Sequence, residues 1–437
     1  MDEPQDASGR RGGLSGRWLA VAVASVMLLV AGACGGDDGD AGAEEPEDTT
    51  SDSLDSADLL GPEDPASGDP VRIGMVSDGS TDAFDNTDEL RAAEATAEYW
   101  NSHRGGIGGR PIEVITCETG ADPAVATDCG NQMVEEEVVA VALSQSAVAE
   151  SVWEPLHAAG VPTLFFQTNG EEMLADTETS FVMANPVATF FGVPLAVAES
   201  EGADRIAFVN IDVPVALTMF ESGAAETVVE NAGLKYDLVK IPPGTADMTS
   251  QMQQVVSSGA DVVHIIGNDG FCIAAIQGLN AVGYEGEITS IAQCITDATR
   301  EAVGGDLLEG ISITSTMAVG AIDDPAYQRY EAVMAAYGDD VEDVENALGM
   351  GAYTVMASLA AALDGISGEI TPATAAETIR SMSETDFPGA DGQTFQCGGS
   401  QYPEQPAVCS NNSLRATLDA EGSPAIYEAV DATDVLS

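Results

Sequence analysis

From position 71 onward, short apolar runs alternate with longer segments in which apolar residues recur at helical spacing. The first run, 71–76, precedes a segment in which Leu90, Ala93 and Ala97 share one helical face. Regular alternation with short connections predicts parallel strands that are covered by helices on both faces of a sheet. The expected strands are 71–76, 112–117, 138–143, 161–166, 205–211, 234–241, 262–267, 287–291 and 311–316.

The number of expected parallel strands is too large for one small sheet, and a chain of 437 residues is too long for one compact core. We therefore predict an α/β fold with two Rossmann-like lobes. Ligands bind beyond the carboxyl ends of the strands in such sheets. Two facing lobes consequently predict a cleft that is lined by the loops following the strands.

Polar residues occupy several of these loops. Ser144, Gln145 and Ser146 follow the strand 138–143 and begin a helix, where hydroxyls and free N–H groups bind a carboxylate or another anion. Simple capping of that helix by Ser146 explains the same residues equally well. Turn chemistry is the alternative at each of the other loops. Those loops add Gln167, Thr168, Asp212, Asp269 and Gln293 as candidate ligand-binding residues.

The N-terminus has the pattern of a bacterial export signal. Three arginines precede an apolar run at 18–30 that is too short for a comfortable membrane span. Small residues at 31–33 then lead to Cys34, which resembles the lipobox Cys that becomes acylated. We expect residues 1–33 to be a lipoprotein signal peptide, and Cys34 to anchor the protein in the lipid bilayer on the extracytoplasmic face of the cell membrane. Ordinary cleavage beside an incidental Cys, or a retained anchor, are the alternatives.

Residues 34–69 are mostly acidic or small and polar, with little to bury. Such a composition cannot offset the entropy lost on folding, so we predict a disordered acidic tether.

Six further cysteines fall in three close sequential pairs. Pairing between neighbours is the simplest of the connectivities that six cysteines allow. Metal binding is the competing explanation, but no CxxC spacing occurs and the three His do not cluster with the cysteines. We therefore predict disulfides formed in an oxidising compartment. The pairs are Cys117 with Cys129, Cys272 with Cys294, and Cys397 with Cys409.

Charge narrows the class of function. The chain carries 73 Asp and Glu against 14 Lys and Arg, and so acidic a surface repels nucleic acid and anionic membranes. Solubility in an ion-rich medium explains this balance better than an acidic recognition patch. The signatures GxSxG, HExxH and the P-loop are absent from the sequence. We expect no enzyme, no cofactor and no metal site, with a carboxylate-based hydrolase as the catalytic alternative.

Five short segments of the chain, taken in order, resemble the type I periplasmic binding proteins of the branched-chain amino acid ABC importers, the leucine/isoleucine/valine-binding group. The likeness covers about residues 70–420. The segments are VRIGM at 71–75, GGIGGRPIEV at 105–114, DPA at 122–124, GVP at 160–162 and AVGY at 281–284.

The resemblance implies that two lobes joined by a three-segment hinge close on a small ligand and deliver it to a membrane permease. It places lobe 1 at 70–187 and 318–387, and lobe 2 at 188–317 and 388–437. The hinge crossings then lie near Pro186, Val319 and Pro388. It also implies that Ser144–Ser146 and Thr168 hold the ligand carboxylate and that Phe84 contacts the ligand.

The sequence departs from that family at other positions. The family's acid for the ligand ammonium group falls at Ala188, a tyrosine falls at Val215, and the second-lobe glutamate falls at Gln293. Asp212 or Asp269 is the replacement that the sequence offers for the ammonium partner. We predict a monomeric solute-binding lipoprotein that captures an amino acid or a related small polar ligand for an ABC importer. A ligand-sensing receptor module of the same fold is the alternative.

Overall fold

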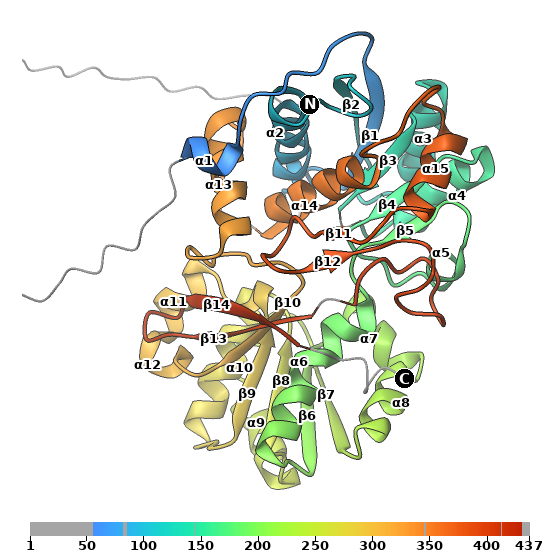
Figure 1. Cartoon of the computed structure of the whole chain (residues 1–437). Coiled ribbons are helices and arrows are strands. Elements are labelled where there is room, and N and C mark those ends of the chain that lie inside the picture. Colours follow the sequence, from blue (N-terminus) through green and yellow to red (C-terminus); the bar gives the residue numbers. More distant parts are fainter. Residues whose placement is uncertain (1–55, 82–84, 145, 345–346, 412, 431–437) are drawn as a thin grey trace, which may run out of the picture. The chain divides into compact units, whose positions relative to one another are not determined.

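Every described residue belongs to the second of the two units into which the chain divides, Met1–Asp52 and Ser53–Ser437. The predicted anchor Cys34 and the candidate residues Phe84 and Gln145 lie outside the described residues. No helix in the described part is both long and apolar enough to cross a membrane. The computed structural model (Figure 1) describes residues 56–81, 85–144, 146–344, 347–411 and 413–430.

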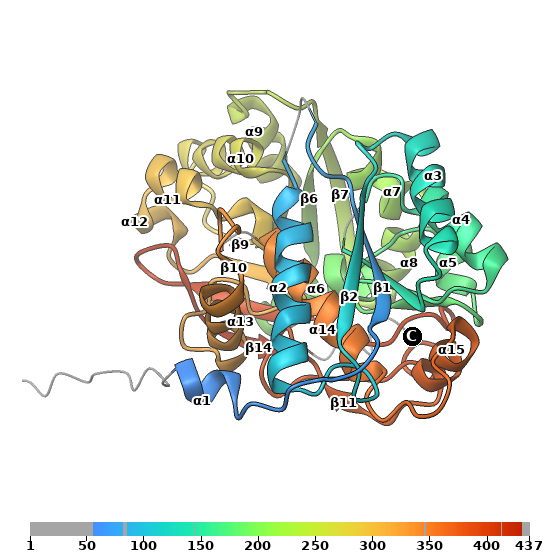
Figure 2. The ribbon, with the colours of Figure 1, turned by 90° about the horizontal axis from the view of Figure 1, so that it is seen from above.

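Five parallel strands form the sheet of lobe 1, in the order β2-β1-β3-β4-β5. Successive side chains of β1 point to opposite faces: Met75 packs in the cluster that includes α2 and α14, and Val76 packs with α3 and α4. Figure 2 shows α2 on one side of β1 and β2, with α3 and α4 on the other. The strands are β1 (Val71–Ser77), β2 (Ile112–Glu118), β3 (Ala140–Leu143), β4 (Thr163–Phe165) and β5 (Ser180–Val182).

Helices from two separate parts of the chain cover this sheet. Helix α14 contacts both α2 and β3, although it lies far from them in sequence, and α13 also packs against α2. Nearly every side chain of α14 is buried, which fits its Ala-rich and Gly-containing sequence. The helices are α1 (Ser56–Leu60), α2 (Thr87–His103), α3 (Pro123–Glu135), α4 (Ala149–Ala159), α5 (Glu171–Ala175), α13 (Pro325–Tyr337), α14 (Ala347–Ala362) and α15 (Pro372–Arg380).

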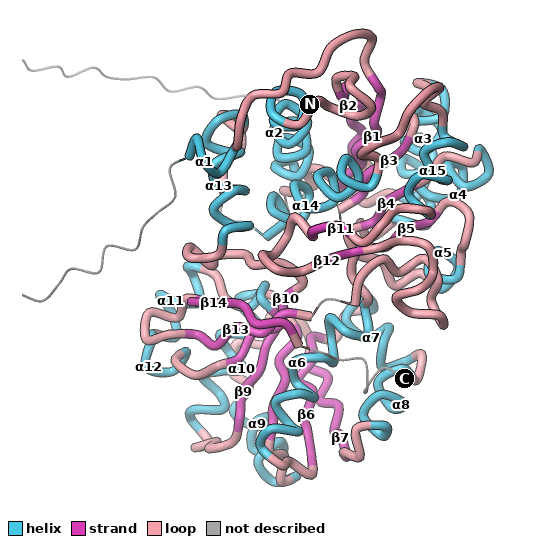
Figure 3. Tube along the Cα trace, viewed as in Figure 1, coloured by secondary structure: helices cyan, strands magenta, loops and turns pink. Residues whose placement is uncertain are grey.

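Lobe 2 contains a seven-stranded sheet in the order β14-β13-β10-β9-β8-β6-β7. Strands β6 to β10 are parallel, and the C-terminal hairpin β13–β14 adds antiparallel to β10 (Figure 3). The elements are α6 (Pro186–Glu201), β6 (Arg205–Ile211), α7 (Pro214–Glu221), α8 (Ala224–Asn231), β7 (Lys235–Ile241), α9 (Thr249–Ser258), β8 (Val262–Ile266), α10 (Asp269–Ala281), β9 (Glu287–Ile291), a 3-10 turn (Ala292–Cys294), α11 (Asp297–Val303), α12 (Gly305–Leu308), β10 (Ser312–Ser315), β13 (Leu414–Leu418) and β14 (Pro424–Ala429).

The parallel parts of the two sheets share one topology. Each has its second strand at the edge, its first strand next, and then the third, fourth and fifth strands in order. The order therefore reverses between β1 and β3 in lobe 1, and between β6 and β8 in lobe 2. Such switch points open a crevice at the carboxyl ends of the strands, because the two following connections diverge to opposite faces. The two Rossmann-like lobes that the alternation predicted are confirmed.

Local sequence explains how several helices begin. Asp122, Asn185, Asp324 and Thr371 each cap a helix whose first residue is proline, and their side-chain oxygens accept hydrogen bonds from N–H groups of the first turn. Proline suits this position because its missing N–H would have no helical partner there. The sequence Asp122-Pro123 thus marks the start of α3.

The structure contains the three predicted disulfides between neighbouring cysteines. Cys117 at the end of β2 is joined to Cys129 in α3, which faces back toward that strand. The other two bonds join Cys272 to Cys294, and Cys397 to Cys409. Each bond therefore fastens a local segment of a lobe.

The expected tether ends earlier than position 69. Residues 56–60 form α1 against α13, and the backbone N–H groups of Asp64 and Ala66 donate to carbonyl groups at the C-terminal end of α2, at 2.9 and 2.8 Å. His103 Nδ1 lies 3.0 Å from the Gly61 carbonyl oxygen. The polar composition of this stretch gave no sign of docking, because the contacts use backbone groups and partners far along the chain.

The chain passes between the lobes at three places. The first lies between β5 and α6, where Asn185 Nδ2 donates to Asn411 Oδ1 at 2.8 Å. The second connects β10 to α13. The third differs from the expected position near Pro388: β11 (Thr385–Asp386), β12 (Thr394–Phe395) and the following segment stay with lobe 1, where Val182 N–H donates to the Ala407 carbonyl oxygen. The chain returns to lobe 2 only at β13.

Candidate functional site

The switch point of lobe 1 holds a buried carboxylate. Asp78 directly follows β1 and is 3% exposed. Its Oδ1 accepts hydrogen bonds from Thr119 Oγ1 at 2.7 Å and from Ser146 Oγ at 2.6 Å, and its Oδ2 accepts one from Ala147 N–H at 2.8 Å. The loops after β1, β2 and β3 are thus fastened together by one side chain.

A second buried carboxylate lies beside the same strand end. Glu89 in the first turn of α2 is fully buried and accepts a hydrogen bond from the Ser77 hydroxyl. Among the described residues, Asp78 and Glu89 are the only buried carboxylates, although the chain has 73 acidic residues. The sequence interpretation missed both residues. The available signal for Asp78 was its place directly after the first strand.

The loop at Ser144–Ser146 was predicted to bind an anion, and a carboxylate of the protein itself, Asp78, accepts hydrogen bonds there. Ser146 donates to Asp78, and its Oγ also accepts from Val148 N–H at 3.1 Å, in a turn that precedes α4. The N-cap of α4 is Val148, whose side chain makes no capping hydrogen bond, so capping of the helix by Ser146 is not what the structure shows. Ser144 is 1% exposed, and a Cβ added at Gly351 of α14 would lie 3.2 Å from its Oγ. Ser144 thus packs against α14 instead of opening into a cleft.

The loop after β4 places its polar residues differently. Thr168 is largely buried, and its hydroxyl oxygen accepts from Gly170 N–H at 3.2 Å. Gln167 is half-buried. Asn169 Oδ1 is buried without a hydrogen-bond partner among the described residues. This loop is polar, but the Thr168 hydroxyl is used in a local turn and not turned toward a ligand.

The switch point of lobe 2 also carries carboxylates. Asp212 follows β6 and is exposed. Asn268 follows β8 and caps α10 through its side chain, which accepts from Phe271 N–H at 3.0 Å. Asp269 is next, half-exposed, and accepts from Gly270 N–H. Gln293, past the end of β9, is exposed.

A cavity of about 490 Å³ brings two of the predicted residues together. Asp269 and Gln293 line it from lobe 2, and Ala347 and Leu348 at the start of α14 line it from lobe 1. Its charged lining residues are three aspartates and one arginine, Arg300, whose Nη1 lies 2.9 Å from the Asp297 carboxylate. The cavity therefore lies between the lobes and has an acidic character. Its lining does not include Ser144, Ser146, Gln167, Thr168 or Asp212.

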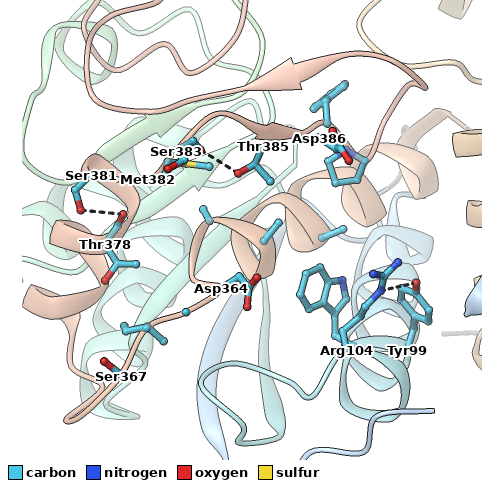
Figure 4. A pocket seen from close by; sticks show the side chains of 18 of the residues that line it. Tyr99, Arg104, Asp364, Ser367, Thr378, Ser381, Met382, Ser383, Thr385 and Asp386 are labelled. Atoms are coloured by element: carbon cyan, nitrogen blue, oxygen red, sulfur yellow. Dashed lines mark hydrogen bonds between the residues drawn. The ribbon is translucent and has the colours of Figure 1, made fainter. Parts of the chain in front are cut away.

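A larger cavity, of about 830 Å³, lies elsewhere in lobe 1 (Figure 4). Arg104 and Tyr99 meet at one end of it, and Thr378 and Ser381 lie at the other. Arg104 belongs to the C-terminal end of α2, and helices run antiparallel to the strands in such sheets. This cavity therefore opens on the helical layer, away from the carboxyl ends of the strands.

The donor set does not suit a metal ion. No group of three or more His, Cys, Asp or Glu in the part of the chain that the structure describes is placed to hold one. His264 is buried in β8, where desolvation lowers its pKa to about 3. It lies within the sheet and is thus a core residue.

Two lobes of this topology, with switch-point crevices and a cavity between them, define the fold of a two-lobed binding protein. The chain belongs to the periplasmic binding protein family, whose family model matches residues 70–407. No protein with a curated function matches the sequence.

Several solved structures have the same fold. The branched-chain amino acid transporter substrate binding protein LivJ from Streptococcus pneumoniae, in complex with isoleucine, is 14% identical, with a TM-score of 0.63 over 83% of this chain and 99% of that one. The leucine binding protein LivK from Thermotoga maritima is 16% identical, with a TM-score of 0.61 over 83% and 99%. A solute binding protein from Rhodopseudomonas palustris, in complex with p-hydroxybenzoic acid, is 20% identical, with a TM-score of 0.64 over 83% and 98%. At these identities the likeness shows the fold alone.

Proposed function

We propose that this protein is an extracytoplasmic solute-binding lipoprotein, anchored at Cys34, that captures a small polar ligand for an ABC importer. The observation that carries the proposal is the cavity lined by Asp269 and Gln293 from lobe 2 and by Leu348 from lobe 1. It lies at the carboxyl ends of the strands, where this topology binds ligands. The size suits a compound of amino-acid dimensions.

The mechanism is closure of two lobes around the ligand. Three segments of the chain connect the lobes, and at one of them Asn185 donates to the side chain of Asn411. A ligand that contacts both lobes stabilises the closed arrangement by its differential affinity and shifts the population toward it. The permease of the importer then recognises the closed form.

A thermal-unfolding screen of the full chain in mild detergent tests this function. The ligands are amino acids, amides, urea, amines and small carboxylates. A specific ligand at a hundred times its Kd stabilises the folded state by about 2.7 kcal/mol, because it binds only that state. At least one compound should produce such a shift. If every class leaves the unfolding temperature unchanged, capture of a small polar solute is wrong.

A further inference from the structure

We propose that the cleft selects an organic cation without a carboxylate, such as a primary amine, over the corresponding amino acid. This inference rests on the proposed function, since it names the ligand class of the same cleft. It opposes the expectation that the loop at Ser144–Ser146 holds a ligand carboxylate.

The first reason is that lobe 1 supplies its own carboxylate. Asp78 takes the Ser146 hydroxyl, the Ala147 N–H and the Thr119 hydroxyl, which are the donors that a ligand carboxylate would need at this switch point. A second carboxylate brought to the same place would meet the Asp78 charge, and these three donors are already engaged. The Ser144 hydroxyl has no hydrogen-bond partner among the described residues, but it is buried where α14 packs on it at Gly351, away from a ligand.

The second reason is the charge that is buried there. Carboxylates are seldom buried without compensation, because desolvation penalises the charged form. Here the buried carboxylate of Asp78 directly follows β1. Asp78 forms no ion pair with any described residue. A cationic ligand in the neighbouring crevice supplies the opposite charge.

The third reason is that lobe 2 adds negative charge on its side of the cleft. Asp212 and Asp269 flank its switch point, and the only basic residue lining the cavity, Arg300, is neutralised by Asp297. The connections that follow the strands contain no Lys, Arg or His in either lobe. A ligand ammonium group therefore meets favourable potential from both lobes, and a ligand carboxylate meets none.

Matched ligand pairs test the proposal on the full chain by calorimetry and thermal unfolding. The pairs are leucine with isoamylamine, ornithine with putrescine, and tyrosine with tyramine, with p-hydroxybenzoate added as a carboxylate. The members of each pair differ only by the carboxylate, so size and shape are controlled. In at least one pair the amine should bind about tenfold or more tightly than its amino acid.

Variants then locate the charge that matters. Asp269→Asn, in the lining of the cavity, should weaken amine binding by about tenfold, and Asp78→Asn, at the switch point of lobe 1, should weaken it several-fold. Asp306→Asn, an exposed aspartate of α12, is the control and should bind as the unchanged protein does. If Asp78→Asn fails to fold, the ligand pairs and Asp269→Asn still decide the question.

The outcomes separate the two proposals. Tighter binding of an amine, weakened in Asp269→Asn and unchanged in Asp306→Asn, supports the cation-selective cleft. Binding of an amino acid, an uncharged amide or p-hydroxybenzoate in preference to every amine overturns it and leaves the solute-binding function intact. If no compound of any class binds, both proposals are overturned.

Discussion

The core of lobe 2 contains a histidine that should make the protein sensitive to acid. His264 lies fully buried in β8, its ring edge-on to Phe208 with centroids 5.9 Å apart. The Thr289 hydroxyl donates to the Val263 carbonyl oxygen at 3.3 Å, so His264 Nδ1 donates to Thr289 Oγ1 at 2.8 Å. Nε2 is buried and has no hydrogen-bond partner in the part of the chain that the structure describes. Protonation would place a charged N–H there with no acceptor.

The size of the effect follows from linkage between protonation and folding. Burial lowers the pKa of His264 from 6.5 to about 3, so between these pH values the unfolded chain binds a proton that the folded chain does not. The free energy of unfolding therefore decreases as the pH falls below 6.5, the ordinary pKa of a histidine side chain. Each pH unit in this window costs about 1.4 kcal/mol, so lowering the pH from 7.5 to 5.0 costs about 2 kcal/mol through this residue.

Urea unfolding under non-reducing conditions at these two pH values measures this loss. His264→Phe removes the titrating group and keeps an aromatic ring beside Phe208. Between pH 7.5 and 5.0, the free energy of unfolding of this variant should therefore decrease by about 2 kcal/mol less than that of the unchanged protein. Ile265→Val, the buried neighbour in β8, is the control: it should cost about 1 kcal/mol at both pH values. If His264→Phe and the unchanged protein lose the same stability on acidification, the explanation through His264 is refuted.

Three further predictions concern the anchor, the disulfides and helix packing. Cys34→Ala should release the protein from membranes in a fractionation assay, and unchanged membrane association would rule out the lipid anchor. Intact mass after thiol alkylation without reductant should show no modified residue among the other six cysteines, because all six are paired; any alkylated member contradicts the pairing. Gly130→Ala should destabilise the protein by about 1–3 kcal/mol in urea unfolding, since its Cβ would lie 2.5 Å from the Val152 carbonyl oxygen where α3 crosses α4. Gly270→Ala, which has open space around it, is the control that should cost nothing; equal losses in both variants would exclude the close packing as the cause.

The sequence was sufficient for features that depend on neighbouring residues. Strand and helix periodicity predicted the two lobes, because this signal is local, and the capping pair Asp122 and Pro123 at the start of α3 is a local signal of the same kind. The cysteine spacing likewise predicted the pairing, since each partner is near in the chain.

Contacts between distant residues could not be predicted in this way. The hydrogen bonds of Asp78 reach residues 41, 68 and 69 positions away. The Arg329 Nε donates to the Leu59 carbonyl oxygen across 270 positions, which is how the supposed tether becomes part of lobe 1. Ser144 belongs to a polar loop by its sequence, but its side chain is buried like that of a core residue. The cause is α14, which comes from another part of the chain and covers it.

The docking of residues 56–66 on lobe 1 has a consequence for the proposed anchor at Cys34, because it makes lobe 1 the part of the protein that the anchor would hold. The chain between positions 34 and 56 spans at most about 75 Å when fully extended. In the proposed arrangement, lobe 1 is therefore the lobe that stays near the bilayer, because the segment that leads to the anchor is docked on its surface. Lobe 2, which the three connecting segments join to lobe 1, is the lobe that changes position in this arrangement when a ligand binds. A permease that holds lobe 1 in place would then sense ligand through the changed position of lobe 2.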